Sequence, residues 1–138
     1  MPANTYPIFS KASNNQWAAS TITAANIAKD GTGTVTLVFT ADATNGGFVQ
    51  GIMFKALGTN VATVARIFLN NGLTNATAAN NSLVADITLP ATTLSEVAAQ
   101  PDYFLPINRA LDPGHKLNVT LGTAVAAGYA VTVWGGKY

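Results

Sequence analysis

The stretch "GGFVQGIMFKALGTNVATVARIFLNNG", residues 46–72, predicts two consecutive β-strands that are apolar on both faces. Lys55 and Arg66 are its only charged side chains. A strand with one solvated face alternates apolar and polar residues, because successive side chains point to opposite sides of a sheet. Something must therefore cover the second face of these two strands.

Splitting the stretch by parity defines the two faces. We expect the core face to carry Phe48, Ile52, Phe54 and Ala56 in the first strand, and Val61, Thr63, Ala65, Ile67 and Leu69 in the second. The opposite face combines small apolar residues with one cation per strand. Exposed apolar patches of this kind mark interfaces. We therefore expect another chain, or the N-terminal arm, to bury Val49, Met53, Val64 and Phe68.

Period-two alternation and turn signals recur along the rest of the chain. They predict strands near 17–22, 33–41, 47–57, 61–70, 82–89, 102–108, 115–122 and 128–135. The expected core faces outside the opening stretch are Val35, Leu37 and Phe39; Leu83, Ala85, Ile87 and Leu89; and Leu117, Val119 and Leu121. Segments 20–29 and 91–99 each have room for a helical turn. No long amphipathic helix is predicted.

Eight short strands between turns predict an all-β chain. The natural arrangement is a single-domain, jelly-roll-like antiparallel β-sandwich. We expect residues 1–16, which are polar and contain Pro2 and Pro7, to form an extended N-terminal arm, and residues 17–138 to form the sandwich.

Composition narrows the class of function. Charged residues make up 9% of the 138 residues and the net charge is +1, with no Lys/Arg cluster, which argues against a nucleic-acid partner. The expected uncharged Thr/Asn/Ser surface costs little to desolvate. No signal peptide and no apolar run of about 18 residues is seen, which predicts a protein made in a cytoplasm with no membrane partner.

Residues that could carry chemistry are few. The chain lacks cysteine, and its only histidine, His115, follows a Pro-Gly turn, so we expect no metal site. The six carboxylates are interpreted as turn and surface residues: Asp30, Asp42, Asp86, Glu96, Asp102 and Asp112. We expect no catalytic residue and no cofactor. A hydrolase that uses a carboxylate pair remains a minor alternative.

Aromatic residues carry the remaining signal. Trp134 lies on the face opposite to Tyr129, Val131 and Val133, which suggests an outer face or a subunit contact. Trp and Tyr are enriched at protein–protein hot spots, and they also stack on sugars. The candidate interface residues are Tyr6, Phe9, Trp17, Val49, Met53, Val64, Arg66, Phe68, Trp134 and Tyr138.

Three stretches together resemble small virion proteins of tailed bacteriophages, in the group of capsid decoration (cement) proteins. They are "FKALGTNVATVARIFLNNG" (54–72), "NNSLVADITLPATT" (80–93) and "LDPGHKLNVTLGTAVAAGYAVTVWGGKY" (111–138). The resemblance implies a jelly-roll-like protein that forms homo-oligomers, dimers or trimers, and binds the outside of the major capsid protein shell. It implies no catalytic motif.

Two hypotheses follow. The first is a non-enzymatic decoration protein, made in the host cytoplasm and located on the capsid surface of the virion. The alternative is a carbohydrate-binding or receptor-binding jelly-roll module of a phage tail. A sugar-binding groove would place two or more aromatic side chains on one concave surface.

Overall fold

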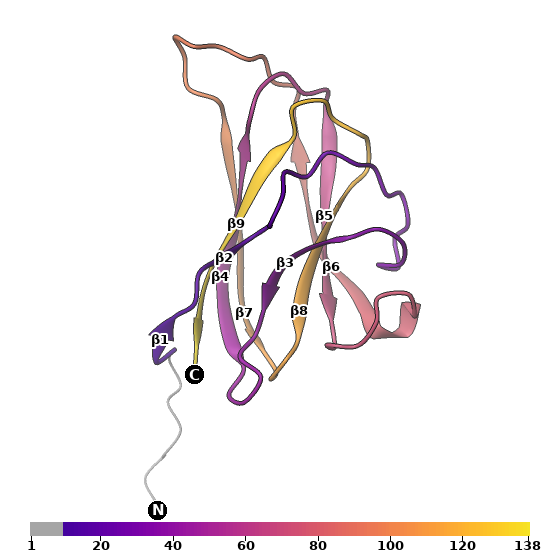
Figure 1. Ribbon diagram of the computed structural model, residues 1–138, viewed down its shortest axis with the longest axis vertical. Coiled ribbons are helices and arrows are strands. Elements are labelled where there is room, and N and C mark those ends of the chain that lie inside the picture. Colours follow the sequence, from indigo (N-terminus) through magenta and orange to yellow (C-terminus); the bar gives the residue numbers. More distant parts are fainter. Residues whose placement is uncertain (1–9) are drawn as a thin grey trace, which may run out of the picture.

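Two antiparallel β-sheets pack face to face in the computed structural model, which describes residues 10–138 (Figure 1). Sheet A contains β1 (Ala12–Ser13), β2 (Gln16–Trp17), β9 (Tyr129–Lys137), β4 (Gly47–Ala56) and β7 (Asp102–Leu111). Sheet B contains β3 (Thr36–Thr40), β8 (Lys116–Leu121), β5 (Thr63–Asn70) and β6 (Asn81–Leu89). The 3₁₀ turn η1 (Ala78–Asn80) lies between β5 and β6.

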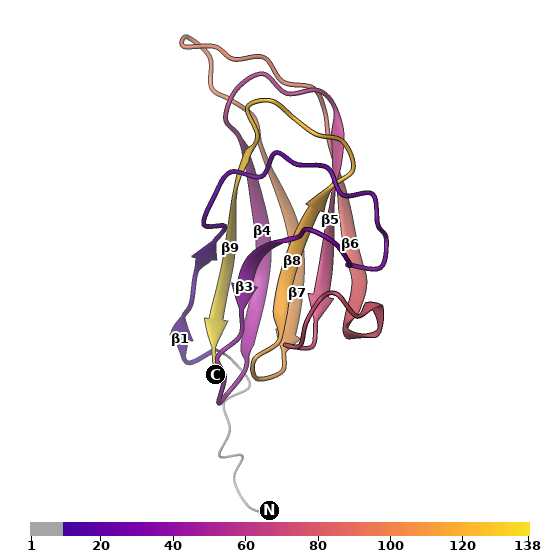
Figure 2. The same cartoon turned by 45° about the vertical axis from the view of Figure 1, so that its right-hand side comes forward.

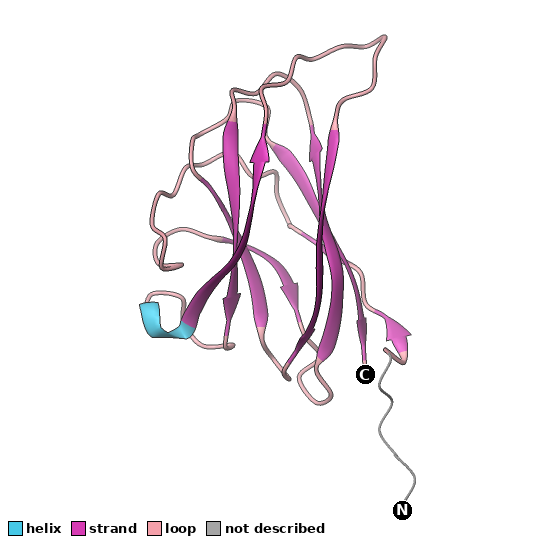
Figure 3. Ribbon diagram, turned by 180° about the vertical axis from the view of Figure 1, so that it is seen from behind, coloured by secondary structure: helices cyan, strands magenta, loops and turns pink. Residues whose placement is uncertain are grey.

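The order of the strands is that of a jelly roll. The short strands β1 and β2 both pair with β9 and together form one edge of sheet A, in the order β1/β2–β9–β4–β7. Sheet B has the order β3–β8–β5–β6. From β3 onward the chain changes sheets at every connection except β5 to β6, so each sheet is assembled from distant segments. Figure 3 shows the strands and the loops that connect them from behind. The predicted β-sandwich is confirmed.

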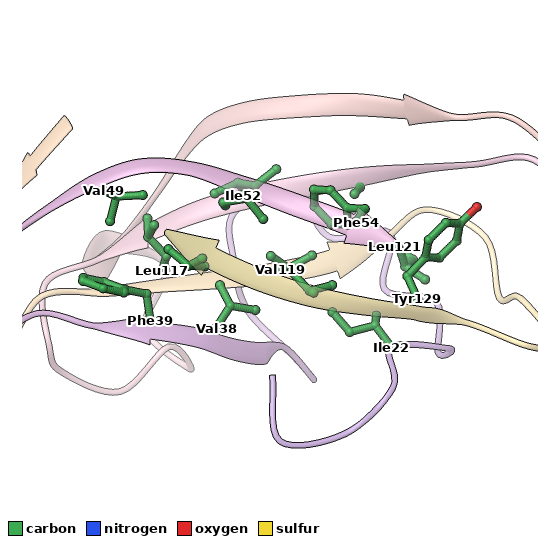
Figure 4. Close-up of a cluster of buried hydrophobic side chains, with 14 of the residues drawn as sticks. Ile22, Val38, Phe39, Val49, Ile52, Phe54, Leu117, Val119, Leu121 and Tyr129 are labelled. Carbon is green, nitrogen blue, oxygen red and sulfur yellow. The ribbon is translucent and has the colours of Figure 1, made fainter. Parts of the chain in front are cut away.

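The core lies between the sheets and consists of alternating inward side chains. Phe39, Ile52, Phe54, Val119 and Tyr129 are among its fully buried members (Figure 4). Each such side chain contributes roughly 1.5–3 kcal/mol relative to an exposed one. Strands β3 to β9 begin and end within three residues of their predicted bounds.

A β-bulge in β4 overturns the predicted faces of two residues in the opening stretch. The register of β4 with both neighbours shifts between Val49 and Gly51. The extra residue reverses the alternation toward the start of the strand. Val49 therefore packs in the core (Figure 4), and Phe48, predicted to face the core, is half-buried on the outer face of the sheet.

Two further bulges, one in β3 and one in β6, each turn outward a leucine that was predicted to face the core. In β3 the register shifts between Leu37 and Phe39, so that Val38 and Phe39 are both buried and Leu37 is 46% exposed. In β6 Val84 is the extra residue, and Leu83 is 40% exposed. The prediction that Leu37 and Leu83 face the core is wrong for the same reason in both strands.

The chain itself covers part of the outer face of sheet B. Residues 25–34, here called the strap, begin beside β8, where Asn26 N donates to Leu121 O. The tip of the strap reaches β6, where Asn81 Nδ2 donates to Asp30 O. Because β5 lies between β8 and β6, the strap crosses β5 on its way (Figures 1 and 2). This crossing answers the question raised by the apolar second face of β5.

The sheet includes part of the predicted N-terminal arm. Residues 11–17 follow the edge of β9, with Lys11 N bonded to Lys137 O and Asn14 N bonded to Gly135 O. The boundary predicted at residue 16 is therefore wrong. Residues 1–9 lie outside the described residues. Segments 20–29 and 91–99, which had room for a helical turn, contain no helix. Their backbone forms isolated β-bridges instead, from Ile22 to Tyr129, from Ala25 to Leu121 and from Thr92 to Asn60.

Candidate functional site

The outer face of sheet A carries exposed aromatic side chains. The register places Met53 beside Phe104 on β7 and beside Thr132 on β9, and Thr132 beside Trp17 on β2. Residues paired in this way point to the same side of a sheet. Phe104, Met53 and Trp17 thus lie in one row across the sheet. Trp17 is 69% exposed and Phe104 is 38% exposed.

A second aromatic contact lies over a glycine. Gly51 pairs with Trp134 on β9 and with Pro106 on β7. The rings of Phe104 and Trp134 pack together with centroids 5.1 Å apart and planes inclined at 32°. A Cβ at position 51 would lie 2.2 Å from Phe104 Cζ, so the glycine makes room for the ring. We call Trp17, Met53, Phe104 and Trp134 the aromatic face.

Few charged residues lie on this side of the sheet. Lys55 lies opposite Asp102 in the register, and its Nζ donates to the carbonyl oxygen of Gln100 at 2.6 Å. The remaining outward positions of the central strands include Gln50, Ala130 and Thr132. The face is therefore suited to apolar and hydrogen-bonding contacts rather than to ionic ones.

The structure places the predicted interface residues in different environments. Trp17, Met53 and Trp134 meet on the aromatic face, and Tyr138 is half-buried at the end of the chain. Tyr6 and Phe9 lie outside the described residues. Val49 and Phe68 have no exposed surface within the chain itself. The prediction that another chain or the arm buries them is wrong: Val49 belongs to the core, and Phe68 lies on β5 where the strap crosses.

Val64 and Arg66 lie on the same outer face of β5 as Phe68. Both are half-buried, and Arg66 is flanked by Asp86 on β6 and Thr120 on β8. Arg66 Nη1 is buried and has no hydrogen-bond partner among the described residues. These two residues are therefore largely covered by the protein rather than presented for docking.

Phe104 belongs to the site although it is not among the candidate interface residues predicted from the sequence. In β7 it alternates with Tyr103 and Leu105, which pack against the core. That alternation was a usable signal, because it places Phe104 on the outer side of the strand. Its proximity to Trp134 could not be read in this way, because it depends on the pairing of β4 with both β7 and β9.

The residues that could carry chemistry occupy turns or the surface. Asp30 accepts hydrogen bonds from the N–H and hydroxyl of Thr32, and these bonds lower the pKa of its carboxyl. Asp42 accepts from Asn45 N and Thr44 N, which likewise lowers its pKa. The other four carboxylates, Asp86, Glu96, Asp102 and Asp112, are exposed, as is Asp30. His115 is a half-buried turn residue.

Neither a metal cluster nor a membrane-spanning helix is found in the part of the chain that the structure describes. Residues 10–138 contain no group of three or more His, Cys, Asp or Glu side chains placed to hold a metal ion. Within the same range, no helix is long and apolar enough to cross a bilayer.

A groove of about 450 Å³ adjoins the aromatic face near the end of β9. Ser13 and Asn15 line one wall, Phe48 and Gln50 line the other, and Trp134 closes one end. Asn15 Oδ1 accepts a hydrogen bond from Gly135 N at 3.1 Å, so its amide NH₂ points elsewhere and can act as a donor.

Comparison with known proteins adds no relative. No protein-family model matches the chain, and no curated protein and no solved structure is significantly similar to it.

Proposed function

We propose that this protein is a non-enzymatic structural protein that docks on a protein shell through the aromatic face of sheet A. The observation that carries the proposal is the grouping of Trp17, Phe104 and Trp134, all exposed, on one side of the sandwich. Aromatic anchors of this kind supply most of the energy of protein–protein contacts. The strap crosses the opposite sheet over β5 and leaves Leu37 and Leu83 of that sheet exposed, so the two outer faces differ in character.

The shell we propose is the head of a tailed bacteriophage, with the major capsid protein as the partner. The resemblance of residues 54–72, 80–93 and 111–138 to decoration proteins supports this assignment. The protein would be made in the host cytoplasm and located on the capsid surface as a homo-oligomer. Nucleic acid, membrane and cofactors have no part in this function.

The size of the face fits a multivalent role. The long strands β9, β4 and β7, together with the short edge formed by β1 and β2, give a projected area of roughly 550 Å². A stable pair of proteins buries about 800 Å² on each partner. Because the accessible surface of the side chains exceeds the projected area of the sheet, one face is comparable in size to a single standard interface. Copies linked to each other on a symmetric shell would bind tightly, because each bound copy raises the effective concentration of the next.

Co-sedimentation of the purified protein with undecorated phage heads tests the proposal. We expect Trp17→Ala combined with Phe104→Ala to weaken binding at least tenfold, because each change removes an exposed anchor. Val61→Ala is the matched control, since Val61 is 56% exposed in the β4–β5 connection, and it should bind within twofold of the parent. Failure of the parent protein to sediment with intact heads would overturn the assignment.

Carbohydrate binding is the second candidate, and the groove favours it. Two aromatic rings, Phe48 and Trp134, border the groove together with the amides of Asn15 and Gln50. Rings and amides are the groups that stack on and hydrogen-bond to sugars. A glycan array gives the test: hits that Trp134→Ala removes would favour this function over shell binding.

A further inference from the structure

A groove of about 220 Å³ lies on the outer face of sheet B, on the other side of the sandwich from the aromatic face. Its floor is β8, where Lys116 and Asn118 alternate with the core residues of the strand. Leu37 of β3 forms one wall, and Leu73 and Asn75 of the β5–β6 connection form the other. The volume is that of about seven water molecules, which suits a ligand the size of one amino acid.

A β-bulge builds one wall of this groove. The register shift in β3 turns Leu37 away from the core, so that it lies beside Asn118 on the outer side of the sheet. Bulges often re-aim a side chain next to a functional site. Leu37 is 46% exposed, and Leu73 on the other wall is 65% exposed. The two walls therefore offer branched apolar side chains to an occupant.

Hydrogen bonds fix the other wall in place. Asn75 Nδ2 donates to Gly31 O and Gly33 O in the strap, at 3.1 and 2.8 Å. Asn80 Nδ2 donates to Thr74 O, next along the same wall, at 2.8 Å. A wall held in this way loses little conformational entropy when a ligand binds, so the groove is preorganised.

The floor of the groove carries a buried amide with no partner in the described part of the chain. Asn118 is only 5% exposed, and its side chain makes no hydrogen bond to another residue among 10–138. Nearly all buried polar side chains are hydrogen-bonded, so an amide that lines a groove in this state points to a ligand. It can donate through Nδ2 and accept through Oδ1.

Lys116 gives the groove a positive charge. Its side chain is half-buried, and no aspartate or glutamate is among the residues that line the groove. A carboxylate beside this ammonium group would form a charge-assisted hydrogen bond. Lys116 and Asn118 are two residues apart on β8 and therefore point to the same side of the sheet. One carboxylate can thus accept from both side chains.

We propose that this groove binds a small carboxylic acid with a branched apolar body. The carboxylate contacts Lys116 and Asn118, and the body lies between Leu37 and Leu73. A free acid and the C-terminal residue of a protein present the same chemistry to such a site. The proposal goes beyond shell docking, because the groove lies on the sheet that the aromatic face does not use.

Two probes of nearly equal shape test the assignment. N-acetyl-leucine carries a carboxylate, and N-acetyl-leucinamide carries a neutral amide in its place. In an NMR titration of the full chain, N-acetyl-leucine should shift the side-chain NH₂ resonances of Asn118, with a dissociation constant of about 1 mM. The neutral probe should bind at least tenfold more weakly. Equal affinities for the two probes would overturn the proposal, as would no shift with N-acetyl-leucine at about ten times that concentration.

Substitutions at Lys116 test the role of its charge. Lys116→Gln should weaken the binding of N-acetyl-leucine at least fivefold, whereas Lys116→Arg should bind within threefold of the parent. Lys29→Gln is the matched control, because it removes the same charge at an exposed strap position that does not line the groove. It should bind as the parent does. Equal affinities of Lys116→Gln and Lys29→Gln would contradict the assignment.

The apolar wall and the buried amide are tested separately. Leu73→Ser changes an exposed loop residue and should weaken N-acetyl-leucine at least threefold; unchanged affinity would show that the wall does not hold the apolar body. Asn118→Leu removes the amide and assigns its resonances. If urea unfolding of Asn118→Leu is no longer cooperative, Lys116→Gln decides the matter.

A short peptide that ends in leucine separates the two sources of the carboxylate. With a free C-terminus it should bind as tightly as N-acetyl-leucine if the occupant is a protein C-terminus, and more weakly if the occupant is a free acid. The same peptide with an amidated C-terminus should not bind, and binding of the amidated form would overturn the proposal. None of these measurements uses phage heads, so their failure is distinct from a failure of shell binding.

Discussion

Phe104 and Trp134 pack together over Gly51, with ring centroids 5.1 Å apart, although the two aromatic residues come from strands that are not neighbours in the sheet. β4 lies between β7 and β9, and a side chain on β4 at this position would keep the rings apart. The glycine is therefore part of the aromatic face. Its absent side chain permits the ring contact, which adds to the energy gained from burying the rings alone.

Gly51→Ala should destabilise the protein by about 2 kcal/mol, because the new Cβ would lie 2.2 Å from Phe104 Cζ and 2.8 Å from Leu105 O. Urea unfolding measures the loss. Adding Phe104→Ala should recover part of it, because the ring is the nearest obstacle, whereas the contact with the backbone oxygen remains. Purely additive effects of the two changes would show that the ring and the glycine are not coupled.

The strap should open when its asparagine contacts are removed. Asn75 Nδ2 donates to Gly31 O and Gly33 O at 3.1 and 2.8 Å, and Asn81 Nδ2 donates to Asp30 O at 3.1 Å. Each bond contributes about 1 kcal/mol, so Asn75→Ala with Asn81→Ala should raise the open population at least tenfold. Trypsin cleavage after Lys29, which is exposed in the strap, reports this opening.

Asn71→Ala is the control for the strap experiment. Asn71 lies in the same β5–β6 connection, and its side chain contacts Asn80 and Leu73 rather than the strap. Cleavage after Lys29 should be unchanged in this variant. Equal cleavage rates in the control and in the double variant would contradict the role assigned to Asn75 and Asn81.

Alternation in the sequence predicted the strands and the sandwich, because period-two patterns follow directly from the geometry of a strand. Alternation assigned Phe48, Leu37 and Leu83 to the wrong face of their strands, and the reason is the same for all three. A bulge adds a single residue and reverses every assignment beyond it, and nothing in the local composition marks where it occurs.

The candidate site was predictable only in part. Trp17, Met53 and Trp134 were selected as exposed or interfacial residues, but their grouping with Phe104 depends on the register of strands far apart in the sequence. The coverage of Phe68 by the strap also could not be predicted from the sequence. It depends on hydrogen bonds from Asn75 and Asn81 to backbone carbonyls, and asparagine in a loop does not indicate its partner.

Stability below about pH 4 should depend on Asp42. Hydrogen bonds from Asn45 N and Thr44 N lower the pKa of its carboxyl in the folded protein. A lowered folded-state pKa means that the stabilisation is present above the unfolded value of about 3.9 and is lost as the pH falls through the folded value. Asp42→Asn keeps an acceptor that does not titrate, so the free energy of unfolding should fall less steeply as the pH is lowered. Urea midpoints measured between pH 2 and 6 give the slope, and an unchanged slope would contradict the prediction.

Shell binding through the aromatic face should depend little on salt. Surface charges further apart than about 8 Å are screened at physiological ionic strength, so an ionic interface weakens steeply as salt is added. On the aromatic face, Lys55 lies opposite Asp102 and the anchors are uncharged rings, so few ionic contacts are available to a partner. Affinity for undecorated heads should therefore change less than about threefold between 0.05 and 0.5 M NaCl. Co-sedimentation across this range is the measurement. A tenfold loss would indicate that cations outside the face, such as Lys11 or Lys137, carry the binding, and Trp17→Ala would then have little effect.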